Sequence, residues 1–261
     1  MGIVNATTDS FSDAGRYTTL EARLELALEL VHDGAEIIDI GGESASPATP
    51  TLDPQQEIGR VVPLIEAVAC ASDATISIDT YKPAVARAAV SAGASIINDI
   101  SGLADPELAD ICAETGAALV IMHNRGVPKR RLLDPELYDD VAGDVLAFLA
   151  QRIELAEAHG VLRQQIIIDP GPDFSKTPAQ TIDVLRRLDL LQQLGARVLL
   201  PISRKDFIGA LTGRAPRSRL GGTLAALDHG MRLGAHIFRV HDVAGARAFI
   251  DARLALAGDT A

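Results

Sequence analysis

Short strand-like runs alternate with longer helical segments along the whole chain, and this alternation constrains the fold more than any other feature of the sequence. Where strand and helix alternate strictly, the strands form a parallel sheet connected by right-handed crossovers. Eight runs fit buried strands: Gly2 to Ala6, Glu36 to Ile40, Thr75 to Asp79, Ser95 to Ile100, Ala118 to Met122, Gln165 to Asp169, Val198 to Ile202 and His236 to Val240.

The segments between these runs have the periodicity of amphipathic helices. Stretches such as LEARLELALELVHDG and VLAFLAQRIELAEAHG repeat apolar residues every three or four positions and stop at glycine. Eight strand–helix units within 261 residues close into a barrel more readily than into an open sheet, and no G-x-G-x-x-G turn follows the first strand. We therefore predict an α/β fold, a single (β/α)8 TIM barrel that forms one domain over residues 1–261.

The composition fits this fold and limits the partners of the chain. Hydrophobic residues make up 48% of the sequence and aromatic residues only 3%, so the core must be built from aliphatic side chains, as in parallel sheets. A formal net charge of −11 opposes binding to nucleic acid or to an anionic membrane surface. An anionic small molecule must therefore be held by local basic residues.

The sequence gives no sign of a membrane span or of a cysteine framework. No apolar run approaches the ~20 residues that cross a bilayer, and the opening MGIVNATTDSF has no charged segment followed by a long apolar one. We expect a cytoplasmic protein. Cys70 and Cys112 lie in helical segments among apolar neighbours, and we predict two buried thiols that bind no metal.

Polar residues follow almost every predicted strand. In a parallel barrel the carboxyl ends of the strands meet at one face, which carries the active site. One such residue could be a helix cap, but eight successive strand ends predict a pocket for a polar aromatic ligand and a phosphate. The residues at these ends are Asn5, Asp39, Asp79, Thr80, Asn98, Asp99, His123, Asn124, Asp169, Ser203, Arg204, Lys205, Arg239, His241 and Asp242.

Eight motifs at these positions resemble the successive motifs of dihydropteroate synthases. They occur in the family order from Met1 to Val243: MGIVNATTDSFSD, DIGGES, SIDTYKP, INDISG, MHNRG, IDPGPDFSKT, SRKDFIG and RVHDV. The resemblance implies a transferase of folate biosynthesis. Such an enzyme condenses 6-hydroxymethyl-7,8-dihydropterin diphosphate with p-aminobenzoate to give 7,8-dihydropteroate and pyrophosphate.

The same resemblance implies roles for individual residues. Catalysis is expected from Asp79, Asp169 and Lys205. The residues expected to bind the two substrates are Asp79, Asn98, Met122, Asp169, Phe174, Ser203, Lys205 and Pro47. Arg239 and His241 are expected to bind phosphate, and Asn5 to bind Mg²⁺.

The chain also departs from the family pattern. The second loop reads Ser44, Ala45, Ser46, Pro47 where the family has a Ser-Thr-Arg-Pro run, so the arginine expected to contact pyrophosphate is absent. This loss leaves open a weakly active or non-catalytic paralogue that binds pterin. A pterin-dependent methyltransferase is a further alternative, although the SRK and RVHD motifs suit an anionic leaving group.

The remaining histidines and the late helices carry weaker expectations. We interpret His32, His159, His229 and His236 as solvated or packing side chains. The resemblance implies a homodimer, and the apolar stretches LGGTLAALDHGMRLG and AGARAFIDARLALAG are compatible with it.

Overall fold

The computed structural model describes residues 1–7, 19–44, 49–130 and 132–258. These residues form an eight-stranded parallel sheet in which the strand order follows the chain order. The strands are β1 (Gly2–Asn5), β2 (Ile37–Gly41), β3 (Thr75–Asp79), β4 (Ile96–Asp99), β5 (Ala118–Met122), β6 (Ile166–Asp169), β7 (Arg197–Leu200) and β8 (Ile237–Phe238). A parallel bridge between Gly2 and Val240 joins the last strand region to the first and closes the ring.

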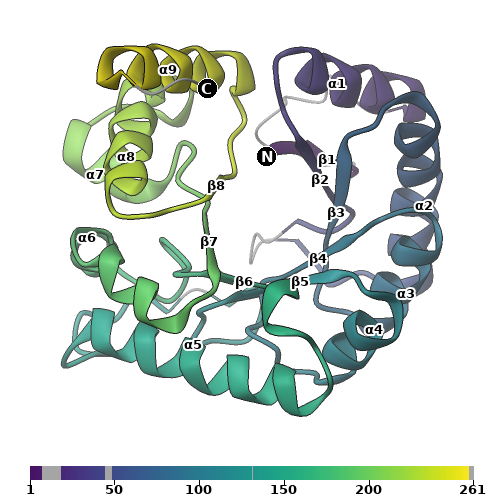
Figure 1. Ribbon diagram of the computed structural model, residues 1–261, viewed down its shortest axis with the longest axis horizontal. Helices are drawn as coiled ribbons and strands as arrows, with labels where there is room; N and C mark the ends of the chain where they lie inside the picture. Colours follow the sequence, from purple (N-terminus) through teal and green to yellow (C-terminus); the bar gives the residue numbers. More distant parts are fainter. Residues whose placement is uncertain (8–18, 45–48, 131, 259–261) are drawn as a thin grey trace.

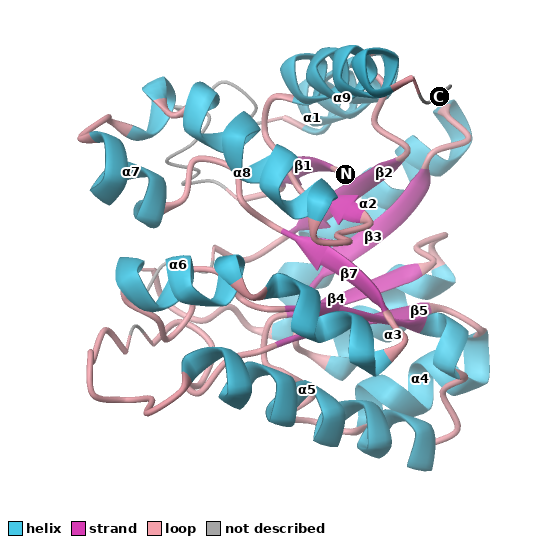
Figure 2. Cartoon of the chain, turned by 60° about the vertical axis from the view of Figure 1, so that its left-hand side comes forward, coloured by secondary structure: helices cyan, strands magenta, loops and turns pink. Residues whose placement is uncertain are grey.

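The helices surround the strands, as Figures 1 and 2 show. They are α1 (Leu20–His32), α2 (Pro54–Ala71), α3 (Pro83–Ser91), α4 (Glu107–Thr115), α5 (Val141–Ala158), α6 (Pro178–Arg186), α7 (Asp206–Thr212), α8 (Leu220–Arg232) and α9 (Val243–Ala257). Short 3₁₀ turns lie at η1 (Arg163–Gln165), η2 (Leu188–Leu194) and η3 (Pro216–Ser218).

Local sequence signals explain where several helices begin. The Thr19 hydroxyl accepts a hydrogen bond from the Ala22 N–H at the start of α1. Asp53 caps α2 in the same way, ahead of a proline whose missing N–H costs nothing at the first helical position. Thr177 and Gln180 form a reciprocal capping box at α6. These caps fix the points at which the chain leaves the barrel mouth.

The strands divide the apolar side chains into two layers. The larger layer lies between the sheet and the helices. A small inner cluster fills the barrel below its mouth and consists of Ile96, Val120, Ile167 and Leu199, from four consecutive strands. Since side chains alternate across a strand, the residues two positions further along β4 to β7 also face the interior, but nearer the carboxyl ends. Those positions are Asn98, Met122, Asp169 and Pro201, which all line the candidate site.

The structure confirms the predicted fold class, with strand boundaries shifted by one or two residues. Cys112 is buried as predicted, but the prediction for Cys70 was wrong, because this residue is exposed. The buried stripe of α2 includes Leu64, Ile65 and Val68, and a residue two positions after Val68 points to the opposite side of the helix.

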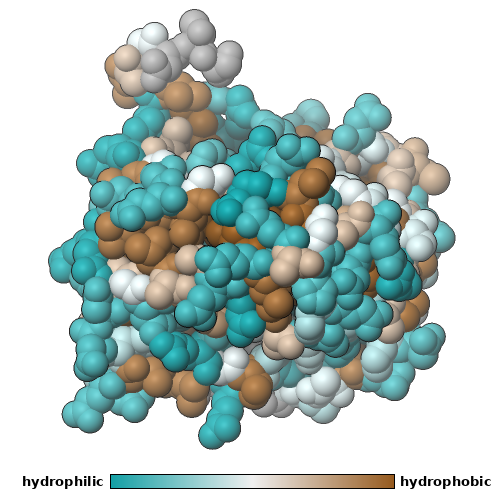
Figure 3. All heavy atoms as spheres, turned by 60° about the horizontal axis from the view of Figure 1, so that its bottom comes forward, coloured by the Kyte–Doolittle hydropathy of each residue, from teal (hydrophilic) through white to brown (hydrophobic). Residues whose placement is uncertain are grey.

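The large hydrophobic side chains that are exposed among the described residues are Leu20, Val127, Leu133, Leu162, Leu211, Leu220 and Leu256. No helix in the described part of the chain is long and apolar enough to cross a membrane. On the face shown in Figure 3, hydrophilic side chains predominate and hydrophobic ones form separate patches.

Candidate active site

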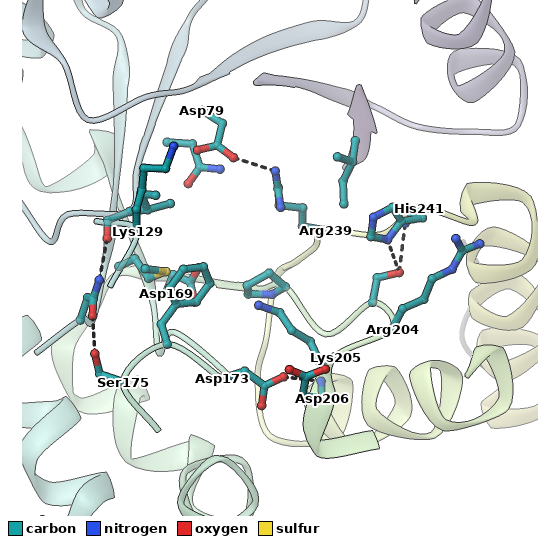
Figure 4. Close-up of a pocket in the computed structure, with 18 of the residues that line it drawn as sticks. Asp79, Lys129, Asp169, Asp173, Ser175, Arg204, Lys205, Asp206, Arg239 and His241 are labelled. Carbon is teal, nitrogen blue, oxygen red and sulfur yellow. Dashed lines mark hydrogen bonds and ion pairs between the residues drawn. The ribbon is translucent and has the colours of Figure 1, made fainter. Parts of the chain in front are cut away.

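A pocket of about 670 Å³ opens at the carboxyl ends of the strands. Its volume suits a bicyclic heterocycle together with a second small molecule. The lining residues come from β1, from β3 to β6, from the segments that follow β4 to β8 and from the start of α7: Ile3, Asp79, Asn98, Ile100, Met122, Asn124, Lys129, Arg130, Asp169, Asp173, Phe174, Ser175, Pro201, Ser203, Arg204, Lys205, Asp206, Arg239 and His241. Most of them are drawn in Figure 4.

Arg239 forms two ion pairs at the pocket floor. Its Nε donates to Asp39 Oδ2 at 2.6 Å, and its Nη2 donates to Asp79 Oδ2 at 2.9 Å. Both carboxylates raise the pKa of Arg239, although burial opposes them. The guanidinium therefore bridges two neighbouring strands, β2 and β3, from its position after β8 (Figure 4 shows the contact with Asp79).

Asp79 holds its proton more tightly than an ordinary aspartate. Burial is the largest cause, and the nearby carboxylate of Asp39 adds to it, so the pKa of Asp79 rises to about 7. The Arg239 guanidinium acts in the opposite direction and only partly compensates. Near neutral pH the carboxyl is thus poised between its two protonation states, and a ligand that donates hydrogen bonds to it favours the ionised one.

Asp169 lies across the pocket with 2% of its surface exposed. Burial raises the pKa of Asp169 to about 6. Two interactions lower this pKa in part: the Gly171 backbone N–H, which donates to Asp169 Oδ1 at 2.7 Å, and the charge of Lys205. Gly171 adopts a φ of +64°, and a Cβ there would collide with the His123 carbonyl oxygen. This position therefore requires glycine.

Lys205 and Phe174 form the second wall. The Lys205 ammonium donates to the Pro172 carbonyl at 3.0 Å and lies 4.6 Å from the centre of the Phe174 ring. Burial is the main cause that lowers the pKa of Lys205, while Asp173 and Asp169 oppose it. A cation on an aromatic face forms an apolar slot with one charged end, suited to an aromatic carboxylate.

Ser203 and His241 meet on the β7–β8 side. The Ser203 hydroxyl accepts from the His241 backbone N–H at 3.1 Å and lies 2.9 Å from His241 Nδ1. These contacts orient the imidazole at the pocket wall (Figure 4). With Arg239 nearby, this side carries the donors that an anion requires.

Behind the pocket lies a buried lysine. Lys176 is 1% exposed, and its ammonium lies 2.8 Å from His123 Nδ1, 3.0 Å from the Gly171 carbonyl and 3.1 Å from the Phe174 carbonyl. Burial lowers the pKa of Lys176 to about 7. Its contacts join the end of β5 to the loop that presents Phe174.

Nine of the residues to which the resemblance gave a role line this one pocket: Asp79, Asn98, Met122, Asp169, Phe174, Ser203, Lys205, Arg239 and His241. Asn124 and Arg204, predicted as polar residues at strand ends, also line it. Asn5 ends β1 at the same face of the barrel without lining the pocket, and Pro47 lies outside the described residues. Sequence reasoning missed the lining residues Lys129 and Arg130. They lie in the loop after β5, where no strand register indicates the direction of a side chain.

The described part of the chain supplies few ligands for a metal ion. Within the described ranges no three histidine, cysteine or acidic side chains group as a metal site. The Asn5 side chain offers one oxygen donor, which fits Mg²⁺ because this ion retains waters and takes further oxygens from a substrate phosphate.

Comparisons with known proteins point to one group. A family model described as Pterin binding enzyme matches residues 1–241. The dihydropteroate synthase of Bacillus subtilis (strain 168) is 44% identical over 244 residues, which cover 93% of this chain and 83% of the relative. The dihydropteroate synthase of Streptococcus pyogenes serotype M3 (strain ATCC BAA-595 / MGAS315) is 44% identical over 246 residues, which cover 93% of this chain and 90% of the relative.

Solved structures agree. The Xanthomonas albilineans dihydropteroate synthase with 4-aminobenzoic acid superposes with a TM-score of 0.91 at 41% identity, covering 100% of this chain and 93% of that one. The Xanthomonas albilineans enzyme in complex with 7,8-dihydropteroate gives a TM-score of 0.87 at 40% identity, covering 100% and 94%. A Yersinia pestis dihydropteroate synthase in a sulfonamide drug complex gives a TM-score of 0.93 at 37% identity, covering 99% of this chain and 93% of that one.

Proposed function

The chain belongs to the family of pterin-binding enzymes, and from this premise we propose that it catalyses the dihydropteroate synthase reaction. In this reaction the amine of p-aminobenzoate displaces pyrophosphate from 6-hydroxymethyl-7,8-dihydropterin diphosphate. The observation that carries the proposal is the convergence of Asp79, Asn98, Asp169 and Lys205 on one pocket whose other wall holds Arg239 and His241.

The pocket floor complements the pyrimidine edge of a pterin. Asp79 and Asp169 each use one carboxylate oxygen in a contact with the protein, to Arg239 and to the Gly171 N–H respectively. Their other oxygens accept from ligand N–H groups, and Lys205 donates to a ring oxygen or nitrogen. A ligand without the amino and ring N–H donors would leave these buried acceptors unpaired.

The slot beside Phe174 suits p-aminobenzoate. The Phe174 ring offers an apolar wall, while the Lys205 ammonium and the Ser203 hydroxyl are donors for the carboxylate. The Xanthomonas albilineans relative with 4-aminobenzoic acid supports this assignment.

The reaction needs positioning and charge stabilisation but no covalent nucleophile. The bond from the pterin methylene carbon to the diphosphate oxygen breaks, its electron pair leaves with pyrophosphate, and the amine nitrogen forms the new bond and then loses a proton to water. Asp79 and Asp169 stabilise the positive charge that develops on the pterin, and Arg239 and His241 stabilise the departing anion.

Mg²⁺ remains a prediction. When bound, the ion would neutralise charge on the diphosphate, and Asn5 is the side chain that would hold it. Its effect is testable by titrating Mg²⁺ against wild-type protein and Asn5→Ala, with pterin diphosphate affinity measured beside turnover.

The test of the function is release of pyrophosphate from the pterin diphosphate with Mg²⁺, with and without p-aminobenzoate. We expect release that depends on p-aminobenzoate and disappears in Asp169→Asn and Lys205→Ala. Tight pterin binding without release would indicate the non-catalytic paralogue. Methyl transfer from a methylated pterin to a corrinoid would indicate the methyltransferase.

Two further expectations from the sequence remain proposals: a cytoplasmic location and a homodimer. The helices α7 and α8 and the end of α9 expose Leu211, Leu220 and Leu256, with Leu256 91% exposed. A second copy of the chain on this side would bury them. Light scattering of the purified protein should give twice the 27.5 kDa monomer mass.

A further inference from the structure

We propose that Asp39 is a positioning residue that fixes which hydrogen-bonding edge the pocket accepts, and this inference rests on the proposed pterin function. Asp39 lies in β2, is 0% exposed and does not line the pocket. Its carboxylate nevertheless contacts two residues that do, Asn98 and Arg239. It therefore acts on the ligand only through them.

The contact with Asn98 determines the direction of that amide. The Asn98 Nδ2 atom lies 3.3 Å from Asp39 Oδ1 and 3.2 Å from Asp39 Oδ2. An ionised carboxylate only accepts hydrogen bonds, so the NH₂ group must face Asp39. Turning the amide over would place its oxygen against a buried carboxylate, which is repulsive at low dielectric.

Because the amide is planar, its oxygen then points away from Asp39. Asn98 lines the pocket, and its Oδ1 accepts no hydrogen bond from the described part of the chain. The side chain therefore offers the ligand an acceptor and withholds its donor. Without Asp39 an asparagine could offer either group.

The contact with Arg239 also determines which groups the pocket offers to the ligand. Its Nε donates to Asp39 while its Nη2 donates to Asp79, so the guanidinium plane is held at two points. This pairing occupies Asp79 Oδ2 and leaves Oδ1 for the ligand. A single carboxylate that the ligand does not touch thus orients a neutral and a charged pocket residue.

The resulting floor has three acceptors and one donor. Asp79, Asn98 and Asp169 accept, and Lys205 donates. This pattern selects a heterocycle with adjacent amino and ring N–H donors, such as the 2-amino-4-oxo edge of a pterin. It discriminates against a 2-oxo analogue, which presents an acceptor where the pterin has its amino group.

The pairing can be reversed by exchanging the two side chains. In Asp39→Asn the residue at 39 can donate or accept, so the Asn98 amide loses its fixed direction. In the double variant Asp39→Asn/Asn98→Asp, the amide at 39 donates to the carboxylate at 98, whose other oxygen again faces the pocket as an acceptor. The exchange conserves the total charge and nearly conserves the volume.

The experiment measures binding of 6-hydroxymethyl-7,8-dihydropterin and of its 2-oxo analogue by calorimetry, with a thermal melt of every variant. For Asp39→Asn we expect at least tenfold weaker pterin binding and a smaller preference over the analogue. In the double variant, the pterin affinity and the preference over the analogue should both return to within a few-fold of wild type. Ser77→Ala is the matched control, because Ser77 pairs with Asp39 in the sheet register, is fully buried and has no hydrogen-bond partner at Oγ among the residues that the structure describes.

The outcomes separate this inference from the function itself. Wild-type protein that does not bind the pterin would overturn both proposals. A wild type that binds, together with a folded Asp39→Asn variant that keeps its affinity and preference, overturns only the role of Asp39. If Asp39→Asn does not fold, the single variant Asn98→Asp tests the inference. Its two facing carboxylates should weaken pterin binding. Unchanged pterin affinity and unchanged preference over the analogue would contradict the role of Asp39.

Discussion

Lys176 Nζ lies 2.8 Å from His123 Nδ1 behind the pocket. His123 Nε2 lies 3.0 Å from Asp144 Oδ1, so Nε2 carries the imidazole proton and Nδ1 accepts from the lysine. Burial and the Lys176 charge lower the pKa of His123 to about 3, which keeps the ring neutral. In its ammonium form, Lys176 satisfies three acceptors with its three protons.

Lys176→Met should loosen the loop after β6. The substitution leaves the Gly171 and Phe174 carbonyls without their donor, and each unpaired buried carbonyl costs about 1–3 kcal/mol. We expect the free energy of unfolding to fall by about 2 kcal/mol, measured by urea denaturation. The KM for p-aminobenzoate should rise more than the KM for the pterin, since this loop carries Phe174. Arg186→Met, on the exposed side of α6, is the control and should change stability by less than about 0.5 kcal/mol.

The same lysine should contribute a pH dependence of stability. In the folded protein its pKa is about 7, against 10.5 ordinarily, so between these values the unfolded chain binds more protons. Stability from this group is therefore fully present above pH 10.5 and is lost as the pH falls through 7. Urea denaturation at pH 7, 8 and 9 should show a contribution to the free energy of unfolding that rises with pH in wild type and is missing in Lys176→Met. Parallel pH profiles of the two proteins would contradict this prediction.

Gly171→Ala should destabilise the site locally. The φ of +64° is unfavourable for alanine, and the new Cβ would collide with the His123 carbonyl oxygen. We expect a loss of at least about 1 kcal/mol of stability and weaker pterin binding, because the Gly171 N–H also donates to Asp169. Gly59→Ala is the matched control: Gly59 lies in α2 with open space around its Cα, and alanine there should stabilise the helix by about 0.5–1 kcal/mol.

The sequence predicted the fold and most of the pocket for a physical reason. The period of two along each strand and the shared polarity of parallel strands fix where Asp79, Asn98 and Asp169 must point. The alternation of strand and helix is a property of the whole chain, so errors of one or two residues at strand ends left the architecture intact.

Two kinds of feature could not be predicted in this way. Lys129 reaches the pocket from an irregular loop, where its φ of 66° sets a direction that no periodicity encodes. The contacts of Asp39 with Asn98 and Arg239 join residues 59 and 200 positions apart, and only the closed ring brings them together. The sequence showed these residues at strand ends but not which side chain orients which.

Pterin affinity should rise with pH through the range in which the two buried carboxyls ionise. The pKa of Asp79 is about 7 and that of Asp169 about 6 without ligand, and ligand N–H groups favour the ionised forms. Binding should therefore release protons around and below pH 7, and the affinity should reach a plateau only where both carboxyls are already ionised in the free protein. Calorimetry at pH 6 in buffers of different ionisation enthalpy measures this release. Asp169→Asn should retain only the part of the proton release that is due to Asp79. Proton uptake on pterin binding would contradict the assignment.

Arg239→Met should shift that pH profile to higher pH. The guanidinium lowers the pKa of Asp79 against burial and the other carboxylates, so without it the pKa rises and pterin binding needs a higher pH to reach its half-maximal affinity. The same change should weaken binding of the pterin diphosphate, since Arg239 also faces the predicted phosphate site. His241→Gln separates the two effects. It should weaken binding of the pterin diphosphate, while the pH midpoint for the diphosphate-free pterin stays fixed, because the largest shifts in the pKa of Asp79 come from burial, Arg239 and the carboxylates of Asp39, Glu57 and Asp99. Equal midpoints in wild type and Arg239→Met would show that the ion pair does not control Asp79.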